Sequence, residues 1–350
     1  MVKGSKSKLP KAVQELVSLI FDVDTMKKSL VEFEIDTKKM PLGKLSKKQI
    51  ERAYLVLGEA LEHLKKLEQK PAVGGDGAAV SSEASVNARL LDCSNRFYTL
   101  IPHDFGMKVP PILNDLELIK NKIAMLDSLS EIEIAYSLLK SECEEDKGAD
   151  PIDKHYRKLK TKVDVVDKTS DEYKMIEDYV SNTHAATHSH YKLVVEEAFK
   201  VDVKGRRSAT GPSSSCPTDS CSGTALVSLT MLGLRIAPPE APVTGYMFGK
   251  GVYFADMVSK SANYCSTSKT NSTGIILLCE VALGNMYERT GAEYVEKLPA
   301  GKHSTKGVGR TCPDPTATLK LEGDVEVPLG KALEPAVVGE NPLPRDTGLV

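Results

Sequence analysis

Tyr253, Ser261 and Tyr264 stand close together in the chain and offer two aromatic faces and a hydroxyl group. If Gly251–Phe254 forms a strand and a helix starts in Ser259–Tyr264, all three side chains can face one cleft. Aromatic faces and hydrogen-bonding groups suit a flat ring that carries a polar substituent. A plain structural interpretation also fits, in which the tyrosines belong to the core and Ser261 caps the helix. The spacing alone leaves both interpretations open.

Other groups of chemically active residues carry weaker signals. Gly301–Gly309 has the composition of a phosphate loop but lacks the Walker spacing. Cys216 and Cys221 have no matching second pair, which argues against a zinc site. Three histidines could suggest a metal ion, although a turn of hydrogen-bonded histidines is favoured: His184, His188 and His190. We therefore expect no metal in this chain.

Size and composition limit the possible classes of protein. The 350 residues, 41% of them hydrophobic, suffice for about two domains with real cores. The formal charge of −2 provides no global basic field for nucleic acid, and Lys3–Lys11 and Lys44–Lys48 fit solvated helix ends or a tail. No apolar run approaches the ~18 residues of a membrane span, and the N-terminus lacks the apolar core of a secretory signal. Seven scattered cysteines fit free thiols in a reducing compartment.

The first ~145 residues have the periodicity of helices. Val13–Phe21 and Ile50–Leu67 repeat apolar residues at helical spacing, with Ser46 as the expected cap of the second segment. Ile119–Leu139 predicts another helix, buried on more than one face. Pro71–Val86 is rich in Gly, Ala and Ser and predicts a flexible surface loop. These faces together predict a helical bundle.

From Asp150 the pattern changes to short apolar runs between Gly and Pro, after a segment at 155–166 that could still be partly helical. Gly274–Leu283 predicts a buried strand. The runs are Tyr191–Phe199, Gly251–Phe254, Gly274–Ala282 and Val325–Leu329. The predicted fold class is therefore α+β, with an N-terminal helical bundle followed by a β-rich domain.

Three stretches of the chain resemble the poly(ADP-ribose) polymerase family, in its DNA-damage-responsive type. Leu234–Cys265 is similar to the donor loop and nicotinamide-binding segment of that family. Met40–Ser46 and Phe97–Gly106 are similar to blocks of its helical regulatory domain. The resemblance implies a helical regulatory domain at residues 6–144 and an ADP-ribosyltransferase catalytic domain at residues 150–350. The DNA-sensing modules of the family have no counterpart in the chain.

The resemblance also implies an activity. Enzymes of this family use NAD+ as a co-substrate, release nicotinamide, and add ADP-ribose to protein acceptors, themselves included, or to a growing chain. It implies a nuclear protein of the DNA damage response and of DNA repair. Contact with DNA would pass only through the modules that this chain lacks, and no membrane partner is implied.

The roles of single residues are assigned through the same resemblance. Tyr264 stacks on nicotinamide and Ser261 binds its carboxamide. Tyr253 packs on the opposite side, as the tyrosine of the family's catalytic His-Tyr-Glu set. Arg235 reaches the adenosine end, and Pro238–Gly249 is the donor loop over the cleft. The implied NAD+-binding residues are Arg235, Tyr246, Tyr253, Ser261 and Tyr264.

The resemblance implies that the histidines at 184–190 lie in a structural turn and that Gly301–Gly309 is a surface loop. Asp127, Glu131 and Glu133 lie on the helix expected nearest the NAD+ cleft, and the plain interpretation is that they form its solvated face. By resemblance, that helix could screen the cleft until the bundle loosens.

Residues 205–233 do not carry the family's His-Gly-Ser strand, and their Ser, Thr and Gly content predicts a loop. Codons for Ser220–Leu226 can be written so that the shifted reading frame spells Leu-Leu-Trp-His-Gly-Ser. Neighbouring codons permit a family-like segment on either side. We therefore hypothesise that residues 205–233 are an out-of-frame translation of a normal active-site segment; an encoding sequence that does not spell that frame would refute it.

The resemblance stops near Lys331, before the Asn-Glu-Tyr strand whose glutamate completes the catalytic set. Residues 332–350 form a proline-broken tail in which Glu334 and Glu340 cannot be assigned the catalytic role. Three hypotheses remain: an active transferase, a catalytically dead or mistranslated form that keeps the bundle and part of the NAD+ cleft, and an interaction module that works through its helical half.

Overall fold

The computed structural model describes residues 6–68, 76–140, 150–203, 214–217, 234, 236, 238–242, 246–265, 267, 272–334 and 348–349. The chain divides into two compact units. We call Phe21–Glu142 together with Ala237–Gly245 the helical unit. The rest of the chain, Met1–Ile20, Cys143–Ile236 and Tyr246–Val350, is the mixed unit. The helices of the first half and the strands of the second confirm the predicted α+β class.

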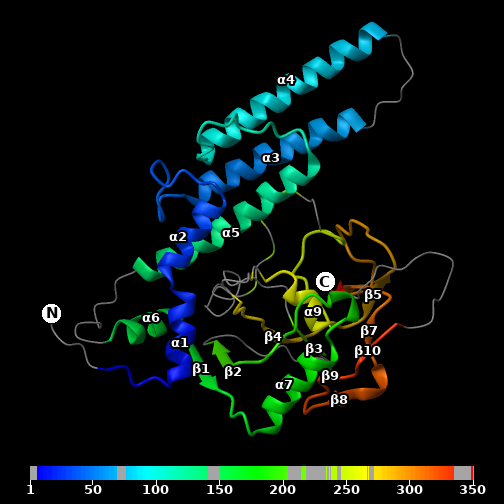
Figure 1. Ribbon diagram of the computed structural model, residues 1–350. Helices are drawn as coiled ribbons and strands as arrows, with labels where there is room; N and C mark the ends of the chain where they lie inside the picture. Colours follow the sequence, from blue (N-terminus) through cyan, green and yellow to red (C-terminus); the bar gives the residue numbers. More distant parts are fainter. Residues whose placement is uncertain are drawn as a thin grey trace. The chain divides into compact units, whose positions relative to one another are not determined.

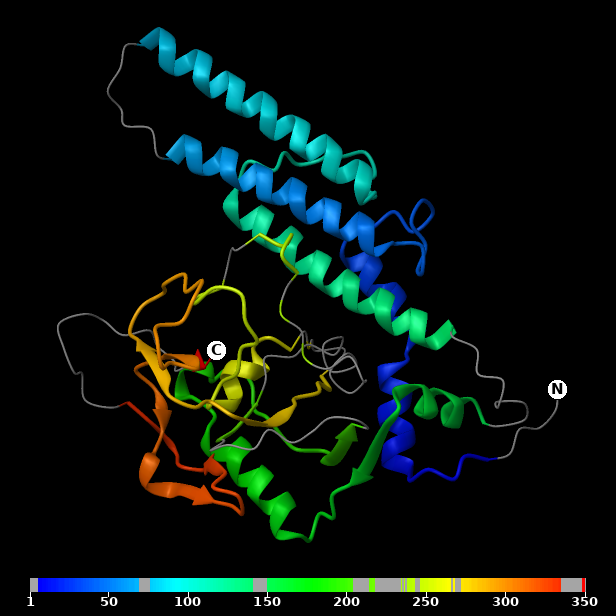
Figure 2. The ribbon, with the colours of Figure 1, turned by 180° about the vertical axis from the view of Figure 1, so that it is seen from behind.

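The helical unit is a bundle of four helices among its described residues: α2 (Val23–Glu32), α3 (Lys47–Glu68), α4 (Asp76–Leu100) and α5 (Leu116–Lys140). Helix α3 lies between α4 and α5 (Figures 1 and 2). The largest fully buried side chains of this unit are Tyr54, Leu57, Leu90, Phe97, Ile101, Leu113, Ile119, Leu126 and Leu129. The bundle predicted from helical periodicity is thereby confirmed.

Local capping explains where the helices of the bundle begin. The Ser46 hydroxyl accepts a hydrogen bond from the Gln49 backbone N–H at 3.3 Å, and the Gln49 side chain accepts one from the Ser46 N–H at 3.0 Å. This reciprocal pair satisfies two N–H groups that the first turn of α3 leaves free. Ser46 is therefore the cap that the sequence predicts.

The predicted surface loop Pro71–Val86 is wrong from Asp76 onward, where α4 begins. The segment contains Ala and Glu, which favour helix, among its Gly and Ser residues. Further along α4, the buried side chains Leu90, Cys93 and Phe97 recur at helical spacing and anchor the helix in the core. Packing of this second half fixes the helix, which then continues through a segment of weak propensity. Residues 71–75 lie outside the described part of the chain.

The acidic residues of α5 do not form the solvated face that the sequence predicts. Asp127 accepts a short hydrogen bond from the hydroxyl of Tyr54, a residue only 2% exposed, and burial raises the pKa of the Asp127 carboxyl. Glu133 accepts a hydrogen bond from the backbone N–H of Gly43 at 3.0 Å, and burial raises its pKa as well. Asp127, Glu131 and Glu133 are all partly buried. These carboxyl groups are part of the packing of the bundle.

Tyr54→Phe is expected to destabilise the helical unit by about 1–3 kcal/mol, because Asp127 then loses a hydrogen bond in a buried place. The measurement is hydrogen exchange of the α3 and α5 amides, read as the free energy of opening. Tyr98→Phe is the control, since the Tyr98 hydroxyl donates to the carbonyl of Pro111 near the surface. Equal destabilisation by the two substitutions would mean that the hydrogen bond from Tyr54 to Asp127 contributes no more than one near the surface.

A buried pair of basic side chains lies between the end of α4 and α5. The Nε2 atom of His103 is 2.9 Å from the Lys122 ammonium, and Nδ1 is 2.6 Å from the carbonyl oxygen of Ile101. The imidazole is thus held neutral, donating through Nδ1 and accepting through Nε2. Burial and the Lys122 charge lower the pKa of His103 to about 4, and burial also lowers the pKa of Lys122.

This pair predicts a loss of stability in mild acid. The unfolded chain takes up a proton on His103 near pH 6.5 and the folded chain only near pH 4, so stability falls as pH drops through that window. The expected loss is about 3 kcal/mol. It can be measured as the opening free energy of α4 and α5 by hydrogen exchange from pH 7 to 4. In His103→Asn this part of the pH slope should vanish; an unchanged slope would assign it to other groups.

Helices α1 (Lys11–Ile20), α6 (Pro151–Leu159) and α7 (Asp171–Asn182) belong to the mixed unit. Helix α1 packs against α6 and β1 (Thr161–Val165) and buries an apolar stripe. Asp150 caps α6 by accepting from the Ile152 N–H at 2.9 Å, with proline at the first helical position. The predicted partly helical segment at 155–166 is thus the end of α6 followed by a strand.

The strands of the mixed unit form four small sheets in its described part. Strand β1 pairs antiparallel with β2, and β10 with β7. A four-stranded sheet has the order β4-β3-β9-β8, and a three-stranded sheet the order β11-β6-β5. The bounds are β2 Phe199–Val203, β3 Ser214–Pro217, β4 Leu278–Val281, β5 Met286–Arg289, β6 Ser304–Gly307, β7 Cys312–Pro313, β8 Thr318–Lys320, β9 Glu326–Pro328, β10 Ala332–Leu333 and β11 Gly348–Leu349.

Several strand predictions need correction. The loop predicted for 205–233 is wrong at Ser214–Pro217, where β3 pairs antiparallel with β4 and parallel with β9. Pairing uses backbone groups, so neighbouring strands can impose it on a segment of low strand propensity. Only Leu278–Val281 of the predicted buried strand Gly274–Leu283 forms β4, and its residues are at least partly exposed because β4 ends the order of its sheet. The prediction at Val325–Leu329 is confirmed by β9.

Candidate functional site

A closed turn brings two of the predicted site tyrosines together. The rings of Tyr246 and Tyr253 lie nearly parallel, with centroids 6.0 Å apart. The Tyr253 hydroxyl donates to the carbonyl of Gly249 at 2.6 Å and accepts from the Phe248 N–H at 3.1 Å. Gly249 has φ +91°, a conformation that favours glycine. Hydrogen bonding therefore occupies the Tyr253 hydroxyl, and its ring lies beside that of Tyr246.

The predicted strand Gly251–Phe254 is wrong, because this segment is irregular with a single bridge at Phe254. The predicted helix start in Ser259–Tyr264 is confirmed by α9 (Val258–Ala262). Ser261 lies in α9 and is fully buried, while Tyr264 follows the helix and is 55% exposed. Tyr264 is thus open to solvent over about half of its surface, whereas Ser261 is closed off from it.

A polar brace fixes α9. The Thr183 hydroxyl accepts from the Val258 N–H at 3.1 Å. The Ser259 hydroxyl accepts from the Ala185 N–H at 2.9 Å and lies 2.9 Å from Nδ1 of His188. Thr183 and Ser259 are both fully buried, so these bonds are sheltered from water. They set the position of the helix that carries Ser261.

The predicted turn of hydrogen-bonded histidines is confirmed for His184 and His188. His188 belongs to the short 3₁₀ helix η2 (Ala186–His188), and its Nε2 lies 2.9 Å from the side-chain amide of Asn263. Nε2 of His184 lies 3.1 Å from the His188 carbonyl oxygen, and His190 packs edge-on against Tyr191. The sequence singled out these histidines but did not reveal the buried partner Ser259.

The donor loop predicted at Pro238–Gly249 is shared between the two units. Residues 237–245 belong to the helical unit and the chain from Tyr246 to the mixed unit. Ala241 is 2% exposed and belongs to the core of the bundle. Arg235, predicted for the adenosine end of NAD+, lies outside the described residues.

The surface loop predicted at Gly301–Gly309 is wrong in its centre. Ser304–Gly307 forms β6, and Ser304 and Thr305 are buried. The Lys302 ammonium bonds the carbonyl of Met286 at 2.8 Å and the side chain of Asn285 at 3.3 Å. Parallel pairing with β5 converts the segment into a strand, and Lys302 is engaged within the protein.

The C-terminal prediction concerns Glu334 and Glu340. Ala332–Leu333 forms β10, a short strand paired with β7, and Glu334 follows it at an exposed position. The predicted tail 332–350 therefore begins with a strand, and Gly348–Leu349 near its end forms β11, paired with β6. Glu340 lies outside the described residues, as do Cys221 and the side chain of Cys216.

Comparison with known proteins assigns the chain to a family. The family model described as poly(ADP-ribose) polymerase, regulatory domain, matches residues 7–156. The model described as poly(ADP-ribose) polymerase catalytic domain matches residues 170–345, which include both α9 and the turn with Tyr246 and Tyr253. This match extends past Lys331, where the resemblance was expected to stop, and corrects that expectation. The chain belongs to the poly(ADP-ribose) polymerase family.

Individual relatives agree with this assignment. The chain is 54% identical to poly [ADP-ribose] polymerase 1 of Gallus gallus over 339 residues, which is 95% of this chain and 32% of the relative. Its identity to the Xenopus laevis protein of the same name is 55% over 333 residues, 94% of this chain and 32% of the relative. Poly [ADP-ribose] polymerase 2 of Homo sapiens is 41% identical over 337 residues, 95% of this chain and 54% of the relative. The chain thus spans about a third of the length of the first two relatives.

Proposed function

We propose that the chain contains the regulatory and catalytic parts of an NAD+ ADP-ribosyltransferase, at residues 6–144 and 150–350. The reaction breaks the bond between nicotinamide and ribose and transfers ADP-ribose to a protein acceptor, the enzyme itself included, or to a growing chain. The catalytic-domain match over residues 170–345 supports this proposal most directly. It contains Leu234–Cys265, the segment whose sequence first indicated nicotinamide binding.

The proposed binding residues divide between the two ends of NAD+. Tyr264 stacks on the nicotinamide ring, Ser261 binds the carboxamide, and Tyr253 with Tyr246 packs on the other side. The exposed ring of Tyr264 and the adjacent rings of Tyr246 and Tyr253 fit a flat aromatic ligand. Burial of Ser261 requires that its surroundings open when the carboxamide binds. Arg235 is proposed for the adenosine end.

The chemistry demands more than binding. Positive charge develops on the ribose as its bond to nicotinamide breaks, so electron-rich groups must stabilise the transition state. The tyrosine of the family's catalytic set has its counterpart in Tyr253. The printed residues 205–233 do not contain the His-Gly-Ser strand, and the glutamate of the set has no counterpart near Glu334. This motivates a second candidate: a catalytically dead or mistranslated form that binds the nicotinamide moiety without transferring ADP-ribose.

The wider setting is proposed from the family alone. We propose a nuclear protein of the DNA damage response and DNA repair, whose contact with DNA passes through modules outside this chain. NAD+ is its co-substrate, and the proposed reaction requires no metal. None of the described helices is long and apolar enough to cross a membrane.

Two measurements on the full chain separate the candidates. Labelled NAD+ should mark the protein itself if it is an active transferase and leave it unmarked if it is a dead form. A benzamide that mimics nicotinamide should raise the melting temperature in either case, because both candidates keep the nicotinamide end of the cleft. Absence of labelling together with absence of a benzamide shift would contradict both and favour an interaction module.

Tyr264→Ala is expected to weaken benzamide binding by about tenfold, because the ligand loses a stacking face and its buried area. The affinity is measured by calorimetry on the full chain. Val194→Ala is the matched control: Val194 is also in the mixed unit, is 75% exposed, and has no proposed role. Equal affinities of the two variants would remove Tyr264 from the proposed site.

A further inference from the structure

A group of potential metal ligands lies in the helical unit, far along the chain from the proposed NAD+ residues. Glu59 and His63 are four residues apart on α3, so both project from one face of the helix. Cys93 lies on α4, the helix packed against that face. One ligand atom from each of the three lies within 4.8 Å of the others. We propose that Glu59, His63 and Cys93 bind a zinc ion that links α3 to α4.

The chemistry of the three groups suits zinc. A thiolate, an imidazole nitrogen and a carboxylate oxygen are its usual protein ligands, at about 2.0–2.3 Å. In a tetrahedral site such ligand atoms lie roughly 3.3–3.7 Å apart, so a group whose atoms lie within 4.8 Å of one another needs a closure of at most about 1.5 Å. Glu59 has the side-chain freedom to supply it, and water would take the fourth position.

The surroundings of His63 provide a second observation. The residue is 7% exposed, and its Nδ1 atom is buried without a hydrogen-bond partner among the described residues. Its Nε2 atom is 3.7 Å from an oxygen of Glu59, which is longer than a hydrogen bond. A buried polar atom without a partner is costly, so most native structures provide one. Nε2 is the nitrogen that faces Glu59, so zinc would bind there, and Nδ1 would still lack a partner among the described residues.

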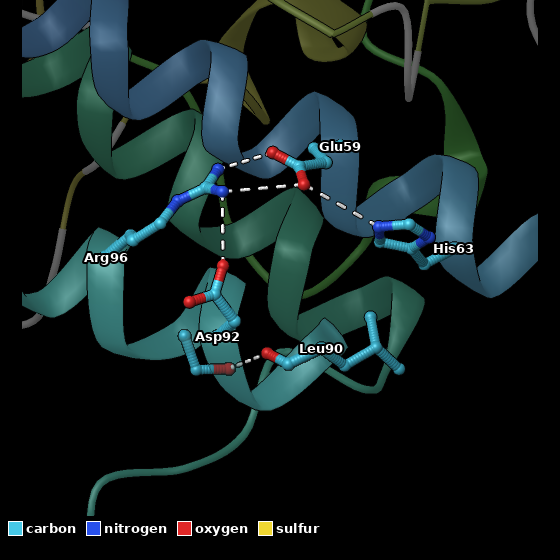
Figure 3. Close-up of polar contacts among 6 residues, drawn as sticks. Glu59, His63, Leu90, Asp92 and Arg96 are labelled. Carbon is cyan, nitrogen blue, oxygen red and sulfur yellow. Dashed lines mark hydrogen bonds and ion pairs between the residues drawn. The ribbon is translucent and has the colours of Figure 1, made fainter. Parts of the chain in front are cut away.

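Charge around the group also permits a divalent cation. Figure 3 shows Glu59 between Arg96 and His63, with Asp92 on the other side of the guanidinium. Because Arg96 already bonds Asp92 at 3.2 Å, it keeps a carboxylate partner when Glu59 turns toward a metal. Arg96 and Asp92 then balance each other, and Glu59 with a Cys93 thiolate balances the two charges of zinc.

The site is closed on one side and open on the other. Cys93 is fully buried, while the Glu59 side chain is 44% exposed and gives an ion access. Zinc binds a thiolate, so the thiol proton of Cys93 passes to solvent when the sulfur–zinc bond forms. Magnesium and calcium take oxygen ligands, and the sulfur of Cys93 therefore favours zinc over both.

The test uses the full chain, freed of metal with a chelator and titrated with zinc. Hydrogen exchange of the α3 and α4 amides is the readout. Zinc that binds only the folded bundle lowers the population of its open form, and the amides then exchange more slowly. At free zinc a hundred times the dissociation constant, the expected slowing is about a hundredfold. Cobalt is the spectroscopic probe, since a thiolate ligand gives a charge-transfer absorption band.

Three variants make the outcome specific. Cys93→Ala should abolish both the slowing of exchange and the cobalt band. Glu59→Gln keeps the shape of the side chain and should weaken the affinity for zinc by at least tenfold. Cys312→Ser removes a partly buried thiol in the mixed unit and should change neither readout. Exchange in α3 and α4 that is indifferent to zinc would overturn the proposal. So would a cobalt band that survives in Cys93→Ala, because another thiol would then be the ligand.

Discussion

Replacing residues 205–233 by the segment that the shifted reading frame spells is expected to raise NAD+ cleavage at least about a hundredfold. The replacement supplies the histidine of the family's His-Gly-Ser strand, for which the printed chain has no counterpart. A group that stabilises charge at a transition state is worth about a hundredfold to a thousandfold in rate.

The rate is measured as nicotinamide released from NAD+ by the full chain, with and without the replacement. The matched control carries alanine in place of the single histidine of the new segment, so it restores the strand without the catalytic side chain. The chain with the replacement should release nicotinamide faster than both the unaltered chain and this control. If the control releases nicotinamide as fast as the histidine form, the segment acts through folding alone. If the chain with its own residues 205–233 already releases nicotinamide as fast as the chain with the replacement, the activity gives no support to the reading-frame hypothesis.

Leu57→Ala is expected to destabilise the helical unit by about 3–5 kcal/mol. Leu57 is fully buried in the core between α3 and its neighbours. Truncation removes buried apolar contacts and leaves a cavity that a close-packed bundle cannot fully close. The regulatory part of the chain would then open far more often, which hydrogen exchange of the α3–α5 amides measures directly.

Leu55→Ala provides the control on the same helix. Leu55 is 57% exposed, so the same chemical change should cost less than about 1 kcal/mol. The two substitutions have the same effect on helix propensity, and the difference between them isolates core packing. Comparable losses would mean that the bundle does not pack around Leu57 as the structure describes.

Much of the helical unit could be predicted from sequence because its signals are local. The spacing of buried residues within Ile50–Leu67 and Ile119–Leu139 is the helix period, and Ser46 with Gln49 forms a cap from residues three positions apart. The exception is α4, whose first turns have weak propensity and were predicted as a loop. The packing that holds that helix lies in its second half, beyond the reach of local propensity.

The mixed unit was harder to predict, since its strands are short and depend on distant partners. Ser214–Pro217 becomes β3 only by pairing with segments some 60 to 110 residues further along the chain. Ser304–Gly307 becomes β6 through parallel pairing with β5. Such pairing is decided by contacts that no local pattern records.

For the proposed site, the sequence by itself determined the family resemblance and the types of side chain: Tyr253, Ser261 and Tyr264 in one segment. Tertiary structure decided that the Tyr253 hydroxyl closes a turn, that Ser261 is buried and that Tyr264 is exposed. It also decided that Glu59, His63 and Cys93 meet across two helices. The sequence specifies the residue types. The burial of side chains and the distances between them are set only when segments remote in sequence pack together and exclude water.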